Sequence, residues 1–254
     1  MDLLSVRQEL SDLARTGSRR TFIKGAFAVA AVGGSAAAGF PSLFGTASAA
    51  GADTNAAILK AARTAEELAT TFYYQGIAGP TAAKLGPVHD NGNLNYFQAA
   101  LWQEYQHVRI LTNPLGADRY GTGTFYFPTS WFDNAGSFLA ALDVLETAFI
   151  GAYLAAIREF AENGFPFYSE VAGEFLGTEC EHRVLGRVAS GSNPPNQWIL
   201  EKAEFTNVSD AVGVLATYLN PATGSAYTLP TPDQISAAAA PFNNLLNPGS
   251  VQAG

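Results

Sequence analysis

The chain has 254 residues, and its 48% hydrophobic and 12% aromatic content is enough to bury the core of one domain with attached segments. Charged residues make up only 14% and the formal net charge is −8, which excludes nucleic acid and anionic membrane surfaces as default partners. The single cysteine, Cys180, excludes an internal disulfide framework and CxxC zinc modules.

The N-terminal residues carry the features of an export signal. Arg19 and Arg20 are adjacent in the stretch SRRTFIK, ahead of a moderately apolar stretch rich in alanine and glycine, and ASAAGA supplies a small-residue cleavage site after Ala49. This pattern predicts a twin-arginine signal peptide over residues 1–49 and export to the periplasm or the extracellular space. A membrane anchor is the alternative, but the composition of the stretch and Pro41 argue against it.

Cleavage of the signal peptide would leave a more acidic chain. The segment holds 5 of the 14 basic and 3 of the 22 acidic residues, so 9 basic and 19 acidic residues remain, a net charge of −10. We expect no stable membrane insertion of this mature chain. The twin-arginine route exports proteins that are already folded, often with a metal or cofactor inside, so the signal also favours a bound cofactor.

Beyond the signal, apolar periodicity and Pro/Gly breaks predict a helical protein. The expected helices span residues 54–76, 94–112, 132–162, 166–189 and 208–219. Pro166 lies where a helix can begin, and SGSNPPN ends that helix. TFYFP is the only short strand candidate that we find in the sequence.

The lengths of the connections predict the topology. The short connection between the third and fourth helices makes them antiparallel neighbours, whereas residues 113–131 can run the whole length of a bundle and cover it with their aromatic side chains. We therefore expect an all-α fold, a four-helix bundle over residues 54–190 with a long crossover between helices 2 and 3. Residues 191–254 form a C-terminal extension with one helix, and residues 231–254 are expected to be an extended tail that wraps the domain.

Each of the four core helices has one glutamate on its apolar face. Counting in steps of three and four along each helix places Glu66, Glu104, Glu146 and Glu179 in line with leucine, valine and aromatic residues. Two of these helices add a histidine three residues later on the same face, and the full set is Glu66, Glu104, His107, Glu146, Glu179 and His182.

Four carboxylates in an apolar core need positive charge beside them. Each ionised group would cost several kcal/mol to bury without a partner. Residues three apart on a helix have Cβ atoms about 5–6 Å apart, so a glutamate and a histidine in that register can bind one ion. Two such pairs and two further glutamates supply six side chains, which predicts a site for two metal ions.

The order Glu66, Glu104-Tyr-Gln-His107, Glu146, Glu179-Cys-Glu-His182 resembles the di-iron carboxylate set of the ferritin-like superfamily. More narrowly, a signal sequence together with ELATTFYYQGI, EYQHVRIL, LETAFIGAY and ECEHRVL is similar to the secreted ferritin-like family that includes plant desiccation-related proteins. The resemblance covers residues 55–190. It implies a ferritin-like four-helix bundle.

The resemblance also implies roles for the six residues, as metal ligands and as the catalytic set. Glu104 and Glu179 would bridge or chelate the metals, and His107 and His182 would each bind one metal. Glu66 and Glu146 would be terminal ligands, although Glu67 adjoins Glu66 and competes for its place. Two metal ions are expected, with iron ahead of manganese, since oxygen- and nitrogen-rich sites suit both.

Several residues also have plainer interpretations. Glu104 and His107 could be an exposed pair on a solvated helix face. We expect Glu181 and Arg183 to be surface charges, His89 to be a loop residue and Cys180 to be a packing residue. Tyr73 and Tyr153 are expected to be core aromatics first, and residues beside the metal ligands second.

Two classes of function fit this pattern. The first is a binuclear metal protein that reacts with O₂ or peroxide, as a ferroxidase, in protection against oxidative stress, or with activity like a manganese catalase. The alternative is a non-catalytic stress-protective or envelope protein that uses the bundle as a scaffold. In either case the C-terminal region could pack on the bundle or form a homo-oligomer.

Overall fold

The computed structural model describes residues 52–86, 92–245 and 249–251. The expected signal peptide and His89 lie outside them.

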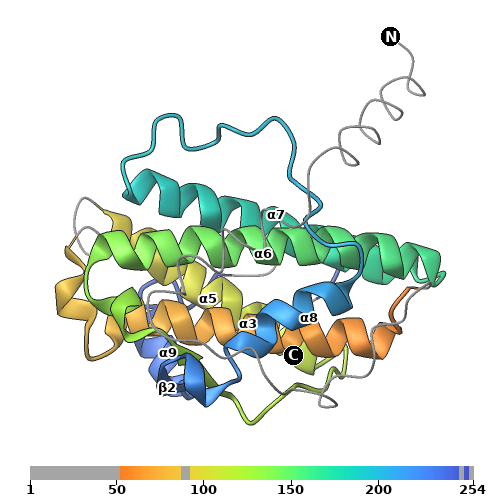
Figure 1. Ribbon diagram of the computed structural model, residues 1–254, viewed down its shortest axis with the longest axis horizontal. Helices are drawn as coiled ribbons and strands as arrows, with labels where there is room; N and C mark the ends of the chain where they lie inside the picture. The colour runs from red at the N-terminus through yellow and green to blue at the C-terminus, as the bar shows by residue number, and fades with distance from the viewer. Residues whose placement is uncertain (1–51, 87–91, 246–248, 252–254) are drawn as a thin grey trace. The chain divides into compact units, whose positions relative to one another are not determined.

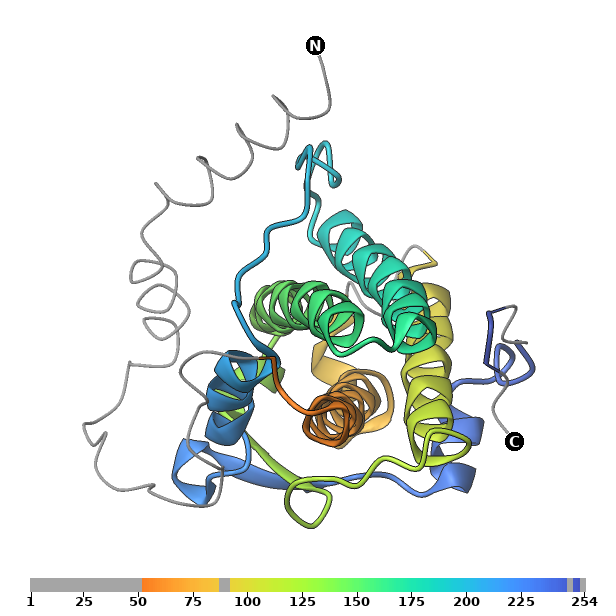
Figure 2. The same ribbon diagram turned by 90° about the vertical axis from the view of Figure 1, so that its right-hand side faces the viewer.

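Four long helices form a bundle, and the view along their axes in Figure 2 shows them arranged around a common centre. They are α3 (Asn55–Ala78), α5 (Asn93–Thr112), α6 (Ala135–Glu162) and α7 (Pro166–Ala189). Helix α3 packs along α5 and α6 packs along α7, while α3 also contacts α6 and α5 contacts α7 (Figure 1). The prediction of an all-α four-helix bundle is confirmed.

The helix ends follow from local chemistry. Thr54 caps α3, where its Oγ1 accepts a hydrogen bond from the Ala57 amide at 3.2 Å. Helix α6 begins three residues later than expected, because residues before it form the 3₁₀ helix η2 (Thr129–Phe132) and Asn134 provides the cap. Pro166 occupies the first turn of α7, as predicted.

The connection between α5 and α6 is the long crossover of the prediction, and it contains the expected strand. This strand, β1 (Thr124–Phe127), pairs antiparallel with β2 (Ser225–Thr228), which the sequence did not predict. Phe125 and Phe127 alternate with more exposed neighbours along β1 and are fully buried against the bundle. The small sheet therefore ties the C-terminal region to the crossover.

The C-terminal extension packs on the bundle. Helix α8 (Val208–Thr217) lies against both α3 and α6, as Figure 1 shows. The expectation of an extended tail is wrong in part, because α9 (Pro232–Ala238) forms there, with Thr231 and Gln234 making a capping box. Two further 3₁₀ turns, η1 (Ala82–Lys84) and η3 (Pro221–Thr223), lie in connections.

The core is rich in aromatic side chains. Phe72 of α3 stacks on Phe138 of α6 with ring centroids 4.7 Å apart, and Phe127 and Phe132 pack around them. Among the described helices, α6 is long and apolar enough to cross a membrane, but 61% of its most apolar window is buried inside the bundle. Packing within the bundle accounts for the apolar character of α6.

Candidate metal centre

The structure brings all six predicted side chains together in the interior of the bundle. Each helix contributes its glutamate, and α5 and α7 add the histidines. Glu104, Glu146 and Glu179 have no exposed surface, and the others are also buried. The alternative of an exposed pair of Glu104 and His107 is therefore wrong.

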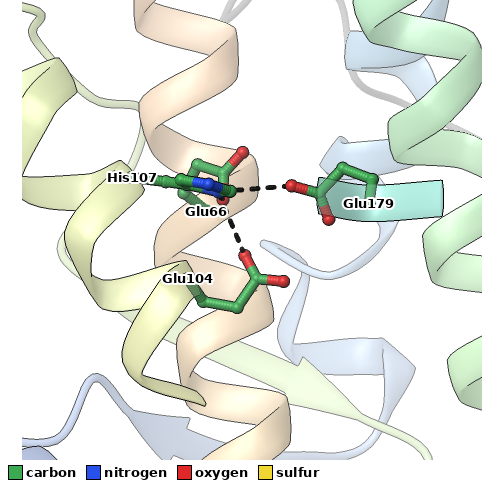
Figure 3. A group of neighbouring side chains, drawn as sticks. All are labelled: Glu66, Glu104, His107 and Glu179. Atoms are coloured by element: carbon green, nitrogen blue, oxygen red, sulfur yellow. Dashed lines mark hydrogen bonds and ion pairs between the residues drawn. The ribbon is translucent and has the colours of Figure 1, made fainter. Parts of the chain in front are cut away.

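The six residues divide into two overlapping groups of four. Glu66 and His107 form one group with Glu104 and Glu179, and Glu146 and His182 form the other with the same two glutamates. Within each group, one ligand atom from each residue lies within 4.8 Å of all the others. Figure 3 shows the first group, with four side chains from three helices pointing toward one another. Glu104 and Glu179 thus belong to both groups.

Both histidines present Nδ1 to the cluster. His107 Nδ1 lies 3.1 Å from a Glu66 oxygen and 3.3 Å from a Glu179 oxygen. His182 Nδ1 lies 2.8 Å from Glu104 and 3.4 Å from Glu179. The i, i+3 spacing inside α5 and α7 therefore directs one imidazole nitrogen into each group.

Gln103 holds one of these imidazoles in place. His182 Nε2 lies 3.0 Å from Gln103 Oε1, and an amide oxygen can only accept a hydrogen bond. The proton is therefore assigned to Nε2, which leaves the Nδ1 lone pair directed at the cluster. The role of Gln103 was not predicted from the sequence, although Gln103 directly precedes Glu104 on α5.

Two tyrosines donate to the glutamates that are not shared. Tyr73 of α3 donates to Glu146 of α6 at 2.7 Å, and Tyr153 of α6 donates to Glu66 of α3. Each tyrosine follows the glutamate of its own helix by seven residues, so the two contacts are reciprocal. Burial raises the pKa of both hydroxyls well above the ordinary value, and the nearby carboxylates raise it further. Both tyrosines therefore remain protonated donors as well as core aromatics.

Many polar atoms of the cluster are buried without a hydrogen bond. They comprise both carboxylate oxygens of Glu104 and of Glu179, one oxygen of Glu146, and Nδ1 of His182. Some of these atoms approach one another closely, but their geometry is not that of a hydrogen bond. Buried polar groups in native proteins are almost always satisfied, so these atoms need another partner. Oxygen and imidazole donors of this kind fit divalent iron or manganese.

The charges of the cluster are strongly perturbed. Burial raises the pKa of Glu104 and of Glu146 well above the usual range, and the adjacent Glu179 raises it further. Burial also acts to raise the pKa of Glu179, but the neighbouring His107 and His182 outweigh it, so this pKa falls. Burial lowers the pKa of His107, but Glu66 and Glu179 outweigh it and raise the pKa to about 10. Protons thus compensate part of the buried charge when no cation is bound.

Glu67 does not enter the cluster. Its buried carboxylate instead accepts from Arg63 Nε at 3.1 Å and from Arg119 Nη1 at 3.2 Å. Glu66 and Glu67 point in different directions because successive helical residues are rotated by about 100°.

Arg183 is buried, so the expectation that it is a surface charge is wrong. Its guanidinium pairs with Glu201 and lies 4.4 Å from the ring centroid of Trp198. Both partners lie in the segment that follows α7, so the fold covers this arginine with residues distant from the helix. Glu181 is exposed as expected, and Cys180 is half-buried.

A four-helix bundle with two interior Glu-x-x-His pairs and two further glutamates defines a ferritin-like protein with a carboxylate and histidine cluster that could bind metal ions. The family model for the ferritin-like domain matches residues 54–191, and the chain belongs to this family. Neither the curated proteins nor the solved structures contain a significant match to the chain.

Proposed function

We propose that this protein binds two metal ions in the buried cluster, iron in the first place and manganese as the alternative, and uses them in O₂ or peroxide chemistry. The observation that carries the proposal is the set of five buried carboxylate oxygens, from Glu104, Glu146 and Glu179, that have no hydrogen-bond partner. Cations satisfy such oxygens and offset the cost of burying their charge.

The geometry supports a distinct role for each residue. Glu104 and Glu179 would contact both ions, since each belongs to both ligand groups. Glu66 and His107 would complete one position, and Glu146 and His182 the other. Tyr73 and Tyr153 orient the two terminal carboxylates, and Gln103 orients His182. When bound, the ions supply one-electron redox chemistry.

As a ferroxidase, the protein would take ferrous ions as its substrate. Two ferrous ions lose one electron each, and dioxygen takes both electrons and two protons to become hydrogen peroxide. With peroxide as the oxidant, the same two electrons and two protons give two molecules of water. The reaction with peroxide removes ferrous iron and peroxide together, which would protect against oxidative stress, whereas the reaction with dioxygen removes ferrous iron but forms peroxide.

The direct test is to add ferrous iron in air and to follow ferric absorbance. We expect the band to grow with the wild-type protein and to be lost in the double variant Glu104→Gln, Glu179→Gln. The matched control is Glu159→Gln, because Glu159 is also a fully buried glutamate but its carboxylate accepts from the amides of Asp53 and Val208, each at 2.8 Å. Equal rates in the wild type and the double variant would refute the proposal.

The choice between iron and manganese needs a separate measurement. Elemental analysis of protein exported by its own host would identify the resident ion. Evolution of oxygen from peroxide by manganese-loaded protein would instead indicate a reaction like that of manganese catalase. Its absence, together with ferrous oxidation, would assign the iron reaction.

Export belongs to the same proposal. Residues 1–49, with Arg19 and Arg20, support twin-arginine export to the periplasm or the extracellular space. Replacing both arginines by lysine should keep the uncleaved protein in the cytoplasm, which immunoblotting of cell fractions would detect. Export that continues unchanged in this variant would contradict the proposed route.

A second candidate, a non-catalytic scaffold that associates through the C-terminal region, is favoured by one observation. Ile199 is 98% exposed and Leu200 is 62% exposed in the segment between α7 and α8. Exposed apolar side chains at adjacent positions suit a protein contact, including one between two copies of the chain. Light scattering of the wild type and of Ile199→Ser, Leu200→Ser would test the oligomer, and exported protein without metal would favour the scaffold.

A further inference from the structure

An apolar cavity lies between α3, α6 and α8, outside the ligand cluster. Its volume is about 60 Å³, and its walls include Ile58, Ala65, Ala152, Tyr153, Ala211 and Leu215. Small alanine side chains on all three helices leave this space where larger residues would fill it. Helix α8 of the C-terminal extension forms its outer wall.

The cavity is suited to an apolar occupant and not to water. A space of about 10–15 Å³ is enough for one water molecule, but the water also needs two to four polar partners. Apart from Tyr153 and Tyr218, the residues that line this cavity have hydrocarbon side chains. The hydroxyl of Tyr153 is already engaged with Glu66. The cavity is partly open to solvent, and its apolar walls favour a small apolar molecule over ordered water.

The cavity adjoins the ligand cluster at two points. Tyr153 forms part of its wall and donates to Glu66. A second apolar cavity of about 20 Å³ shares Ile58 and Tyr153 with the first and is also lined by Phe175, whose ring stacks on His107 with centroids 4.1 Å apart. Apolar space therefore reaches the immediate neighbours of two predicted ligands, both in the group shown in Figure 3.

We propose that the cavity between α3, α6 and α8 is the entry and holding site for dioxygen on its way to the cluster. The proposal rests on the proposed function, since it names the route of one of its substrates. Dioxygen is small and apolar, whereas peroxide needs hydrogen-bond partners that these walls do not offer. The volume also argues against larger ligands, because a cavity of about 150 Å³ is the size that holds benzene.

Xenon binding tests the cavity without any metal, since xenon is a small apolar probe that occupies apolar protein cavities. We expect the ¹²⁹Xe NMR shift to report binding to the wild type and to lose that contribution in Ala211→Leu, which fills the cavity from α8. Ala148→Leu fills it from α6 and serves if the first variant does not fold. Ala216→Leu is the matched control, because Ala216 lies on α8 but does not line the cavity. An unchanged shift in both filled variants would overturn the proposal.

The second measurement is the dependence of ferrous oxidation on dioxygen concentration. In Ala211→Leu we expect the KM for dioxygen to rise about tenfold, which corresponds to about 1.4 kcal/mol, with little change in kcat. Ala216→Leu should match the wild type, and the rate with peroxide should be the same in all three proteins. An unchanged KM in a variant that no longer binds xenon would show that dioxygen enters elsewhere.

The two experiments separate failure of this inference from failure of the proposed function. If the wild type consumes no dioxygen with ferrous iron, the proposed function and the assignment of dioxygen fall together. The xenon shifts still decide in that case whether the cavity takes small apolar molecules.

Discussion

The orientation of His182 depends on one neighbour that binds no ion itself. Gln103 Oε1 accepts from His182 Nε2, and this contact leaves Nδ1 free to face the cluster. Loss of such partners of metal-binding histidines costs about 10- to 100-fold in metal affinity. We predict a loss of this size in Gln103→Leu, measured by anaerobic titration with Mn²⁺.

Gln103→Glu separates positioning from general disruption of the bundle. A carboxylate also accepts from Nε2, so this variant should retain most of the affinity. The ¹⁵N chemical shifts of His182 should report the Nε2-protonated form in the wild type and a mixture of tautomers in Gln103→Leu. Equal affinity in the wild type and Gln103→Leu would contradict a positioning role.

The perturbed pKa values predict how metal affinity depends on pH. Burial and Glu179 raise the pKa of Glu104 and Glu146, and Glu66 and Glu179 raise the pKa of His107 to about 10. Protons therefore compete with the metal ion for these three side chains. Because the ligands must lose their protons to bind a cation, affinity should rise with pH up to about pH 10, the raised pKa of His107, with protons released on binding. Titration with Mn²⁺ in weakly buffered solution containing a pH indicator measures this release. An affinity that is constant with pH would show that the free cluster is already deprotonated.

At the scale of elements, α3 carries a glutamate of the cluster and also binds the crossover through hydrogen bonds of its side chains. Glu67 accepts from Arg119 of the crossover, and Arg63 Nη1 donates to the Ala117 carbonyl at 2.7 Å. Glu67→Ala would leave both arginines without this partner. Since Arg63 and Arg119 are partly exposed, we predict a loss of about 1–3 kcal/mol in the free energy of unfolding, measured by urea denaturation.

Lys60→Ala provides the comparison on the same helix. Lys60 pairs with Asp118 at 3.2 Å, but the Asp118 side chain is 80% exposed, so this variant should change stability by less than about 0.5 kcal/mol. If both variants lose a similar free energy of unfolding, the buried ion pairs of Glu67 stabilise the crossover no more than the exposed pair of Lys60 does.

Two glycines test how closely the helices pack. A Cβ at Gly76 of α3 would overlap the ring of Phe138 on α6, whereas a Cβ at Gly177 of α7 would meet no atom within 4 Å. We predict that Gly76→Ala destabilises the protein by about 1–3 kcal/mol through overpacking. Gly177→Ala should stabilise it by up to about 1 kcal/mol, because alanine favours the helix. Thermal unfolding of both variants would show the opposite signs, and a neutral Gly76→Ala would mean that the Phe138 ring moves aside at little cost.

Local signals were enough to predict the bundle, but not the contacts between distant segments. The apolar stripes and the breaks at Pro and Gly predicted the four bundle helices to within a few residues, and the interrupting glutamates indicated the inward faces. Strand β2 was missed because a four-residue SAYT segment has no pattern of its own and depends on pairing with β1. Arg183 was misread for a similar reason, since the aromatic ring that covers it lies on another segment. The pairing of Tyr73 with Glu146 also needs the packed helices, although the shared spacing of seven residues was visible.

At the scale of the whole molecule, the cluster lowers the stability of the metal-free fold but gives the protein side chains that can bind cations. Four unpartnered oxygens of Glu104 and Glu179 lie in the interior, where an unsatisfied buried polar group costs about 1–3 kcal/mol. A raised carboxyl pKa in the folded state favours folding below that pKa and destabilises the fold as pH rises through it, and Glu104 and Glu146 both behave in this way. The metal-free protein should therefore lose stability as pH rises above the ordinary carboxyl pKa, and the raised pKa of His107 extends the loss to about pH 10. The lowered pKa of Glu179 adds a constant amount of stability over this range.

Removing the charge of Glu104 should stabilise the metal-free protein, whereas removing the metal should destabilise the wild type. We predict that metal-free Glu104→Gln unfolds at a higher temperature than the metal-free wild type, because burial and the adjacent Glu179 oppose the ionised form of Glu104 and a neutral amide is cheaper to bury there. Added Mn²⁺ should raise the Tm of the wild type, since a ligand at 100 times its Kd stabilises by about 2.7 kcal/mol, and should leave the variant unchanged. Differential scanning calorimetry with and without a chelator measures all four states. If the metal-free variant proves less stable than the metal-free wild type, the six side chains stabilise one another without a cation, and the cluster has the character of a structural polar network.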